Sequence, residues 1–447
     1  MSSSPSSSSQ YVEGADGGNG GAGEFERPSS SRRRSGDGVW PDHVVEALAS
    51  QVAIDASRSV GRLAAAPALF NIFQVCSTWR AVSRSELLWE NLTRRIWNRN
   101  HLLHHTWRDE YIYRHRTARN FRLSRYIYTT LHFVPSANNN DGLSCRRLAL
   151  SDHYLAAGFS DGTVRLFHIP TRLHFSTFHP YPRDRLGLFA PAVSGIILSD
   201  TQLIFASLDG DIHVATINNA APLRRSQLGD VLNDGALVDF TGCNRWWVGL
   251  YAGVQGRSFH IWDGESEEIV FIGGSLTNTV ALNGWRSLTE PTEFVGRVRV
   301  TSQETAVACT RLRVIVFDLR HQGIVLGEEE FRRRIIVGTF DASNEAFAVV
   351  NSRGVARVRR VFTLEQVCRF PVEVESMRGL LGCMNGVGVY ALMCGQGFIT
   401  AWDSEDGRRL YDFTERIGEA NAMVADDRYV AASSTDGTIH LWDFGVQ

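Results

Sequence analysis

The chain has 447 residues, of which 43% are hydrophobic, so it is long enough for one large domain and a smaller one. The formal net charge of −2 at pH 7 excludes the strongly basic balance that is typical of nucleic-acid-binding proteins. The seven cysteines are scattered without a Cys-x-x-Cys pair, and no apolar run reaches membrane-spanning length. We therefore expect buried, reduced thiols, no cofactor or bound metal, and no membrane contact.

Residues 1–38 are rich in Ser and Gly and contain few apolar side chains. Such a segment cannot bury enough apolar surface to offset the entropy cost of folding, so we predict a disordered tail. Arg32, Arg33 and Arg34 follow one another in this tail. They fit either a nuclear-import or kinase-recognition patch or a solvated charge cluster.

Residues 39–97 predict an all-α module. A Pro stands where the first helix begins, and apolar residues follow it at helical spacing. A second block places three large residues on one helical face, which is either core or a docking surface. The candidate docking residues of the module are Pro41, Val44, Leu48, Val75, Trp79, Leu88 and Trp89.

Residues 98–124 predict a helical linker, in which Trp107, Tyr111, Ala118 and Phe121 share one helical face. Arginines crowd this stretch and its flanks, with few acidic residues to balance them. A nucleic-acid patch is the alternative interpretation. We favour a packed linker without direct nucleic-acid contact, because aromatic residues interrupt the basic face at core spacing.

Residues 125–447 contain seven related segments. The clearest is residues 436–443, an Asp-Gly turn followed by an alternating strand that ends in Trp-Asp. The equivalent anchor positions lie 40 to 55 residues apart and are Phe167, Ala215, Trp262, Phe317, Arg359, Trp402 and Trp442. A period of roughly 40–50 residues with this ending is typical of WD-type blades. We predict a mainly β chain with a seven-bladed β-propeller, since a β-sandwich would have no reason to repeat at this period.

The last repeat reaches the end of the sequence directly after its third strand. Residues 126–133, just before the first repeat, form an alternating run rich in β-formers. We predict that this run pairs beside residues 438–444 as the outer strand of the last blade. Such a strand would close the ring and cover an edge that invites aggregation.

The Asp-Gly turns are expected on one rim of the propeller, together with two long connections at residues 181–191 and 274–295. Long loops on a rigid scaffold often carry binding residues, and the Arg fork suits acidic or phosphorylated peptides. The predicted substrate-binding residues are Arg183, Arg185, Trp285, Arg311 and Arg353. No catalytic constellation is visible. A propeller enzyme would need clustered polar groups at the central channel, and the sequence indicates none.

Two stretches resemble a known family. The pattern Val75-Cys76-x-x-Trp79-Arg80, followed by Leu87-Leu88-Trp89, resembles the second half of an F-box, and the residues after Pro41 resemble its first half. The segment from Trp107 resembles the helical linker of F-box/WD-repeat substrate receptors. From Trp40 to the C-terminus, the order of motifs is similar to that of the plant STERILE APETALA-type regulators. Trp40 stands where an F-box commonly has Leu.

This resemblance implies a non-catalytic, nuclear substrate receptor of a cullin–RING ubiquitin ligase. The helical module would bind a Skp-type adaptor and, through it, a cullin. The propeller would hold a protein substrate, expected to be a transcriptional regulator in flower and organ development. The alternative is a transcriptional regulator or corepressor scaffold whose propeller bridges DNA-binding proteins.

Every one of the 46 Lys and Arg residues is Arg. Ubiquitin is attached to the primary amine of Lys, whereas the Arg guanidinium stays protonated and is not a nucleophile. A lysine-free receptor would keep its positive charges and offer no side-chain amine to its own complex. Codon bias towards Arg is the competing explanation.

Overall fold

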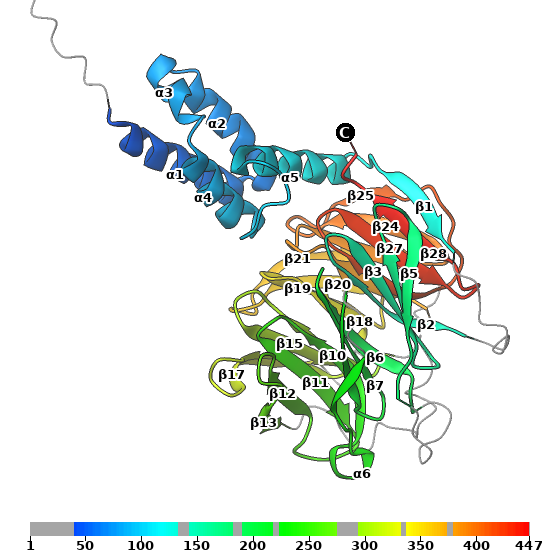
Figure 1. Cartoon of the computed structure of the whole chain (residues 1–447). Helices are drawn as coiled ribbons and strands as arrows, with labels where there is room; N and C mark the ends of the chain where they lie inside the picture. Colours follow the sequence, from blue (N-terminus) through cyan, green and yellow to red (C-terminus); the bar gives the residue numbers. More distant parts are fainter. Residues whose placement is uncertain are drawn as a thin grey trace, which may run out of the picture.

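The computed structural model describes residues 40–132, 143–181, 190–217, 223–274, 294–331, 337–372 and 379–446. Helices form the first part of the described chain and strands form most of the rest (Figure 1). The predicted tail, residues 1–38, lies outside the described residues.

The helical module begins with a long helix and ends with the predicted linker. Its helices are α1 (Asp42–Ser59), α2 (Ala65–Phe73), α3 (Ser77–Val82), α4 (Glu86–Trp97) and α5 (Trp107–Arg122), with a short 3-10 turn at Arg62–Ala64. Hydroxyl side chains cap two of them. Ser85 accepts a hydrogen bond from the backbone N–H of Leu88, and Thr106 accepts one from Asp109.

Residues 49–59, which belong to the predicted all-α module, continue the first helix, α1. Ala49, Ala53 and Ile54 are buried at helical spacing, so this stretch continues the inward face of the helix. Pro67 lies in the first turn of α2, where its missing N–H costs little.

The strands run from β1 (Ile127–Leu131) to the C-terminus, with one short helix, α6 (Val231–Asp234), among them. Strands β2 to β5 are Cys145–Leu150, Tyr154–Phe159, Val164–His168 and Leu173–Phe178. Strands β6 to β9 are Val193–Leu198, Gln202–Ser207, Ile212–Thr216 and Arg224–Gln227. Strands β10 to β13 are Ala236–Gly242, Trp246–Ala252, Phe259–Asp263 and Ile269–Gly273. Strands β14 to β17 are Gly296–Val300, Thr305–Thr310, Arg313–Asp318 and Ile324–Glu330.

The remaining strands complete the same pattern. Strands β18 to β21 are Val337–Ala342, Ala346–Asn351, Val355–Arg360 and Gln366–Pro371. Strands β22 to β25 are Leu381–Met384, Tyr390–Gly395, Phe398–Asp403 and Arg409–Asp412. Strands β26 to β28 are Ala420–Ala425, Tyr429–Ser434 and Ile439–Asp443.

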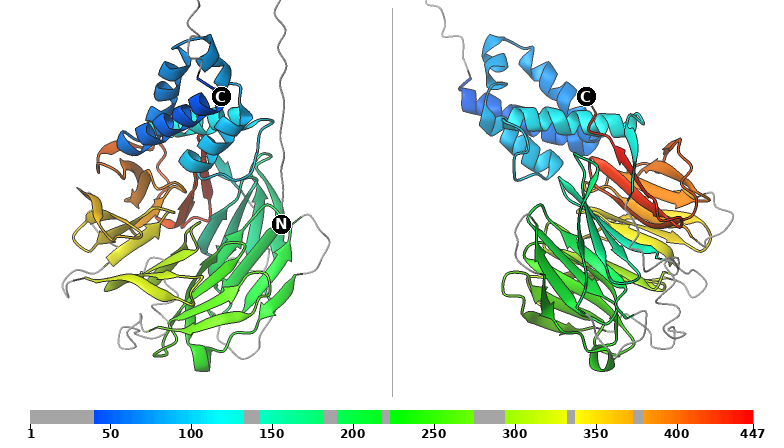
Figure 2. Two further views of the ribbon diagram at one scale, coloured as in Figure 1. Left: turned by 90° about the vertical axis from the view of Figure 1, so that its left-hand side faces the viewer. Right: turned by 45° about the vertical axis from the view of Figure 1, so that its right-hand side comes forward.

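The described strands form five four-stranded sheets and one eight-stranded sheet. The eight-stranded sheet consists of two four-stranded units joined by one parallel pair, Phe240 with Gly195. A Cβ on Gly195 would lie 1.9 Å from the carbonyl oxygen of Phe240, so only Gly allows this approach. The units are arranged side by side (Figure 2), and the prediction of a β-propeller behind N-terminal helices is confirmed.

The predicted ring closure is confirmed. Strand β1 pairs antiparallel with β28, in a register that runs from Ile127 opposite Asp443 to Leu131 opposite Ile439. The last sheet therefore has the order β1-β28-β27-β26 and joins the two ends of the propeller segment. Only Phe133 of the predicted strand lies outside the described residues.

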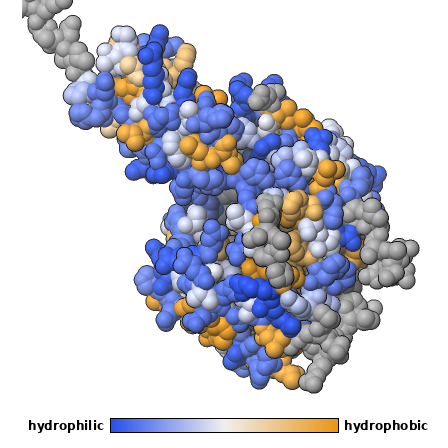
Figure 3. All heavy atoms as spheres, viewed as in Figure 1, coloured by the Kyte–Doolittle hydropathy of each residue, from blue (hydrophilic) through white to orange (hydrophobic). Residues whose placement is uncertain are grey.

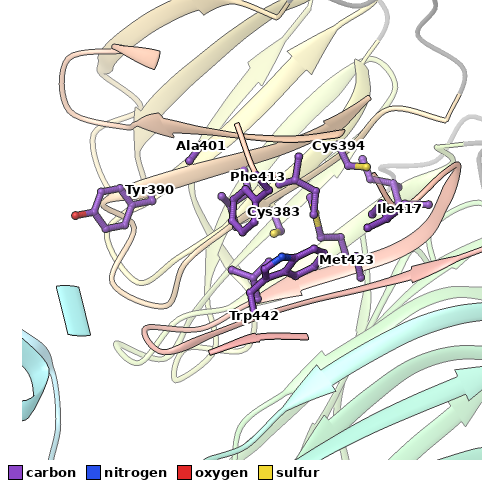
Figure 4. Close-up of a cluster of buried hydrophobic side chains, with 14 of the residues drawn as sticks. Cys383, Tyr390, Cys394, Ala401, Phe413, Ile417, Met423 and Trp442 are labelled. Atoms are coloured by element: carbon purple, nitrogen blue, oxygen red, sulfur yellow. The ribbon is translucent and has the colours of Figure 1, made fainter. Parts of the chain in front are cut away.

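All seven anchors lie on the third strand of their unit, and most are buried. Figure 4 shows the hydrophobic cluster that contains Trp442 and Phe413. The two rings meet edge-on with their centroids 5.2 Å apart, and the Trp442 indole N–H donates to Glu415 at 2.8 Å. At one anchor position Arg359 stands in place of the usual Trp or Phe. It is tolerated because its guanidinium donates to Glu329 and to the carbonyl of Leu364, each at 2.8 Å.

All seven cysteines are free, as expected, but two of them are not buried. Cys76 is exposed between α2 and α3, and Cys243 is half-buried in the turn between β10 and β11. Both positions follow the end of an element, where the chain comes to the surface.

Candidate interaction surfaces

The helical module contacts one rim of the propeller, the rim that carries the turns between first and second strands. Arg62 pairs with Glu345 at 3.2 Å, Asn98 donates to Ser302 at 3.0 Å, and Arg99 pairs with Asp152 at 3.1 Å. The three propeller residues lie in the turns β18–β19, β14–β15 and β2–β3. Because strands in each unit are antiparallel, the turns between second and third strands lie on the opposite rim.

Arg99 makes the best-matched of these contacts. Its two terminal nitrogens face the two carboxylate oxygens of Asp152, and His101 approaches the same carboxylate at 3.1 Å. Burial alone would raise the pKa of Asp152, but the charge of Arg99 and the hydrogen bond from His101 outweigh it and hold that pKa below its ordinary value. The contact therefore joins two charged groups across the module boundary.

The C-terminal end of α5 is held by the last strands. Asn120 donates to the carbonyl oxygens of Phe444 and Val446 at 3.0 and 2.9 Å. The Tyr411 hydroxyl donates to the carbonyl of Phe121 at 2.7 Å, and the rings of Phe121 and Phe444 stack at 4.2 Å. These contacts fix the direction in which the helical module leaves the propeller (Figure 1).

The structure separates the predicted adaptor-binding residues into two groups. Pro41, Leu48 and Val75 are exposed, and the exposed fractions of Leu48 and Val75 are 37% and 62%. Val44 and Trp79 are half-buried. A partner can reach this first group directly.

Leu88 and Trp89 form the second group, and here the expectation of surface contacts needs correction. Both are buried because they lie on the inner face of α4 with Leu92. The Trp89 indole N–H donates to the carbonyl of Ser83 at 2.7 Å, and its ring lies 5.1 Å from that of Tyr111. These two residues can only support the exposed surface from beneath.

The helical module exposes further large apolar residues that the sequence analysis missed as docking candidates, among them Trp40, Phe70 and Leu87. Their exposed fractions are 53%, 60% and 70%. The spacing of Leu88, Leu92 and Ile96 turns those residues inward, so the neighbouring Leu87 had to face outward. In Figure 3 apolar side chains appear on the helical module among polar ones.

On the opposite rim, the predicted turn residues lie where expected. Arg311 is in the turn β15–β16 and Arg353 is in the turn β19–β20, where it is exposed. The other predicted substrate-binding residues, Arg183, Arg185 and Trp285, lie outside the described residues.

The central channel holds a charged cluster that the sequence analysis did not find. Arg147 Nε lies 3.3 Å from Asp239, and Arg299 reaches Asp239 at 3.2 Å and Asp341 at 2.6 Å. All four side chains line a cavity of about 610 Å³. They come from the inner strands β2, β10, β14 and β18, so no local motif joins them.

This cluster connects neighbouring blades. Asp239 accepts from the backbone N–H of Val298, and Asp341 accepts from that of Met384, each at 2.9 Å. Each carboxylate thus binds an Arg side chain and the backbone of the next inner strand. The arrangement positions the inner strands with paired charges.

Among the described residues, no group of three His, Cys, Asp or Glu side chains is placed to hold a metal ion. No helix in the same part of the chain is both long and apolar enough to cross a membrane.

These features define the chain as a β-propeller protein with a helical module on one rim and its other rim clear of that module. The solved β-propeller domain of Cps50 (Swd1) from Myceliophteria thermophila has the same fold, with a TM-score of 0.52 at 12% identity. The match covers 71% of this chain and 99% of that one. No family model matches the sequence.

A full-length relative gives the family. The chain is 56% identical over 448 residues to the transcriptional regulator STERILE APETALA of Arabidopsis thaliana. The match covers 99% of this chain and 100% of the relative. The chain therefore belongs to the STERILE APETALA family, as its motifs suggested.

Proposed function

We propose that this chain is a non-catalytic nuclear regulator of transcription that works by holding other proteins together. The name of its Arabidopsis relative supports the regulatory role, and the propeller fold supports protein binding. One observation carries the proposal: the helical module occupies one rim, so its own surface and the opposite rim are two separate surfaces.

In this account the propeller rim with Arg311 and Arg353 binds one protein, and the apolar surface around Leu48 and Val75 binds another. A rigid scaffold with two separate sites raises the effective concentration of one partner near the other. Contact with DNA is indirect and runs through a bound DNA-binding protein, since the formal net charge of −2 gives no basic footprint.

The test compares the purified full chain with the chain in nuclei. We expect the purified chain to leave the mobility of duplex DNA unchanged, whereas immunoprecipitation from cross-linked nuclei recovers it with chromatin. Tight duplex binding by the purified chain, or its absence from chromatin, would contradict the proposal.

A second candidate function is the substrate receptor of a cullin–RING ubiquitin ligase. It is favoured by one specific observation: Pro41, Leu48 and Val75, which fall in the F-box-like segments, are exposed. Apolar side chains of this size on a surface mark a protein contact when they gather in one patch. In this function the second partner is a Skp-type adaptor that brings the cullin.

The double variant Leu48→Glu/Val75→Glu tests the receptor function. We expect the parent chain to co-purify with a Skp-type adaptor and the variant to retain about a tenth or less, because charges replace desolvated apolar contacts. Val60→Glu is the matched control, since Val60 is 73% exposed on the same module. If the parent chain recovers no adaptor, the receptor function fails.

The absence of Lys gives a separate prediction. Arg32→Lys, Arg33→Lys, Arg95→Lys and Arg122→Lys restore amines in the tail and on exposed helix positions. If the chain serves as a receptor, we expect this variant to acquire ubiquitin and to have a shorter half-life while the ligase is active. Arg→Gln at the same positions is the control, because it removes charge without adding an amine. Equal half-lives and no ubiquitin would favour codon bias.

A further inference from the structure

A groove runs along one side of the helical module, between α2 and α5, and we call it the α2–α5 groove. Its volume is about 360 Å³, within the range of roughly 300–1,000 Å³ of ligand pockets. Leu69, Trp89 and Tyr111 line it and are buried. Phe70 and Ile112 also line it, with exposed fractions of 60% and 39%.

The charged part of the α2–α5 groove is entirely basic. Arg108, Arg116 and Arg119 line it, and with Ile112 they follow one another at helical spacing on α5. No Asp or Glu is among the described residues that line the groove. Among the residues that the structure describes, none of these three guanidinium groups has an ion-pair or hydrogen-bond partner.

The two acidic residues of α5 are already engaged elsewhere. Glu110 is fully buried, where it binds Arg114 and His104, each at 2.7 Å. Asp109 accepts from the Thr106 hydroxyl at 2.8 Å at the start of the helix. Neither lines the groove, so its positive charge is not balanced from its own helix.

We propose that the α2–α5 groove binds an acidic segment of a partner protein that carries at least one large apolar side chain. The apolar side chain would enter between Phe70 and Ile112, and flanking carboxylates would meet Arg108, Arg116 and Arg119. Arg guanidinium groups bind carboxylates in a planar, two-point geometry, which would make the α2–α5 groove selective for acidic side chains. A nucleic acid fits less well, since the groove presents aliphatic and aromatic walls to a phosphate backbone.

This inference goes beyond the proposed function, because it assigns a third surface. Of the predicted adaptor-binding residues, only Trp89 lines the α2–α5 groove, and it is buried. The groove also lies on the helical module, apart from the rim with Arg311 and Arg353. Loss of binding at the groove would leave the other two surfaces intact.

The experiment selects short peptides from a random display library on the full chain, with counter-selection on Phe70→Glu/Ile112→Glu. We expect the enriched peptides to share a large apolar residue flanked by Asp or Glu. Synthetic labelled copies are then titrated with each variant by fluorescence anisotropy, at low and at high salt. Arg116→Glu/Arg119→Glu should weaken their binding by about tenfold or more, because attraction becomes repulsion.

Arg95→Glu is the matched control, since Arg95 is exposed on α4 and does not line the groove. It should bind the peptides about as tightly as the parent, and all variants should melt at the parent's temperature. Peptides without this pattern, or equal binding to the groove variants, would overturn the proposal. So would single-stranded DNA that binds through the three arginines regardless of Phe70, or a dimer of the chain that the same substitutions abolish.

Discussion

Trp442→Ala is expected to lower the free energy of unfolding by about 3–5 kcal/mol, the usual cost of removing a large aromatic side chain from a core. Trp442 is fully buried in the blade that β1 closes. Its ring lies 5.6 Å from that of Tyr128, the β1 residue directly opposite it. The substitution also leaves Glu415 without the indole N–H that it accepts at 2.8 Å.

The measurement is urea-induced unfolding followed by far-ultraviolet circular dichroism. Trp40→Ala is the control, because Trp40 is 53% exposed and its removal should change the unfolding free energy by about 0.5 kcal/mol or less. Equal effects of the two substitutions would mean that the closing blade does not limit stability.

Acidification from pH 7 to pH 5 is expected to lower the free energy of unfolding by about 2 kcal/mol for each of two buried histidines, His213 and His260. Both are 1% exposed, and burial lowers the pKa of each to about 4. His213 Nε2 accepts a hydrogen bond from the backbone N–H of Tyr181, which only an unprotonated nitrogen can do. The His260 ring stacks on Tyr251 at 4.0 Å.

The sign follows from the direction of the shifts. An unfolded His takes up a proton near pH 6.5, whereas these two resist protonation until about pH 4. The unfolded chain therefore binds more protons in this window, and stability falls as the pH drops through it.

Thermal melting at several pH values checks this expectation. His213→Gln/His260→Gln should reduce the fall in melting temperature between pH 7 and pH 5. His43→Gln/His105→Gln, at exposed positions, should leave that fall unchanged. The same slope in all three proteins would show that other groups control the acid response.

The propeller could be predicted because the same short strand-and-turn pattern recurs along the chain. Each anchor, even Ala215 and Arg359, falls on the third strand of its unit, and the run before the first repeat supplies the missing strand of the last one. The period of the pattern gives the order of the strands within each unit. The last unit has only three strands of its own, so the strand before the first repeat is the one that completes it.

The surfaces were harder to predict, for physical reasons that differ from case to case. Arg147, Asp239 and Arg299 meet in the channel only because distant strands converge there, so no spacing in the sequence reveals them. Trp89 matches a motif but is buried, because a motif does not state which side of its helix faces a partner. Phe70 lies in an apolar run, and only the orientation of α2 shows that its side chain faces outward.

Partner recovery from plant nuclei tests the central claim most directly, that the chain holds different proteins at two separate surfaces. Tagged full chain is compared with a helical-module variant, Leu48→Glu/Val75→Glu, and a rim variant, Leu312→Glu/Arg353→Glu, by quantitative mass spectrometry of the bound proteins. All four positions are exposed, and Leu312 lies beside Arg311 in the turn β15–β16. The account predicts that each variant loses a different set of partners and keeps the set lost by the other. Loss of the same set by both variants, or of none by either, would contradict it.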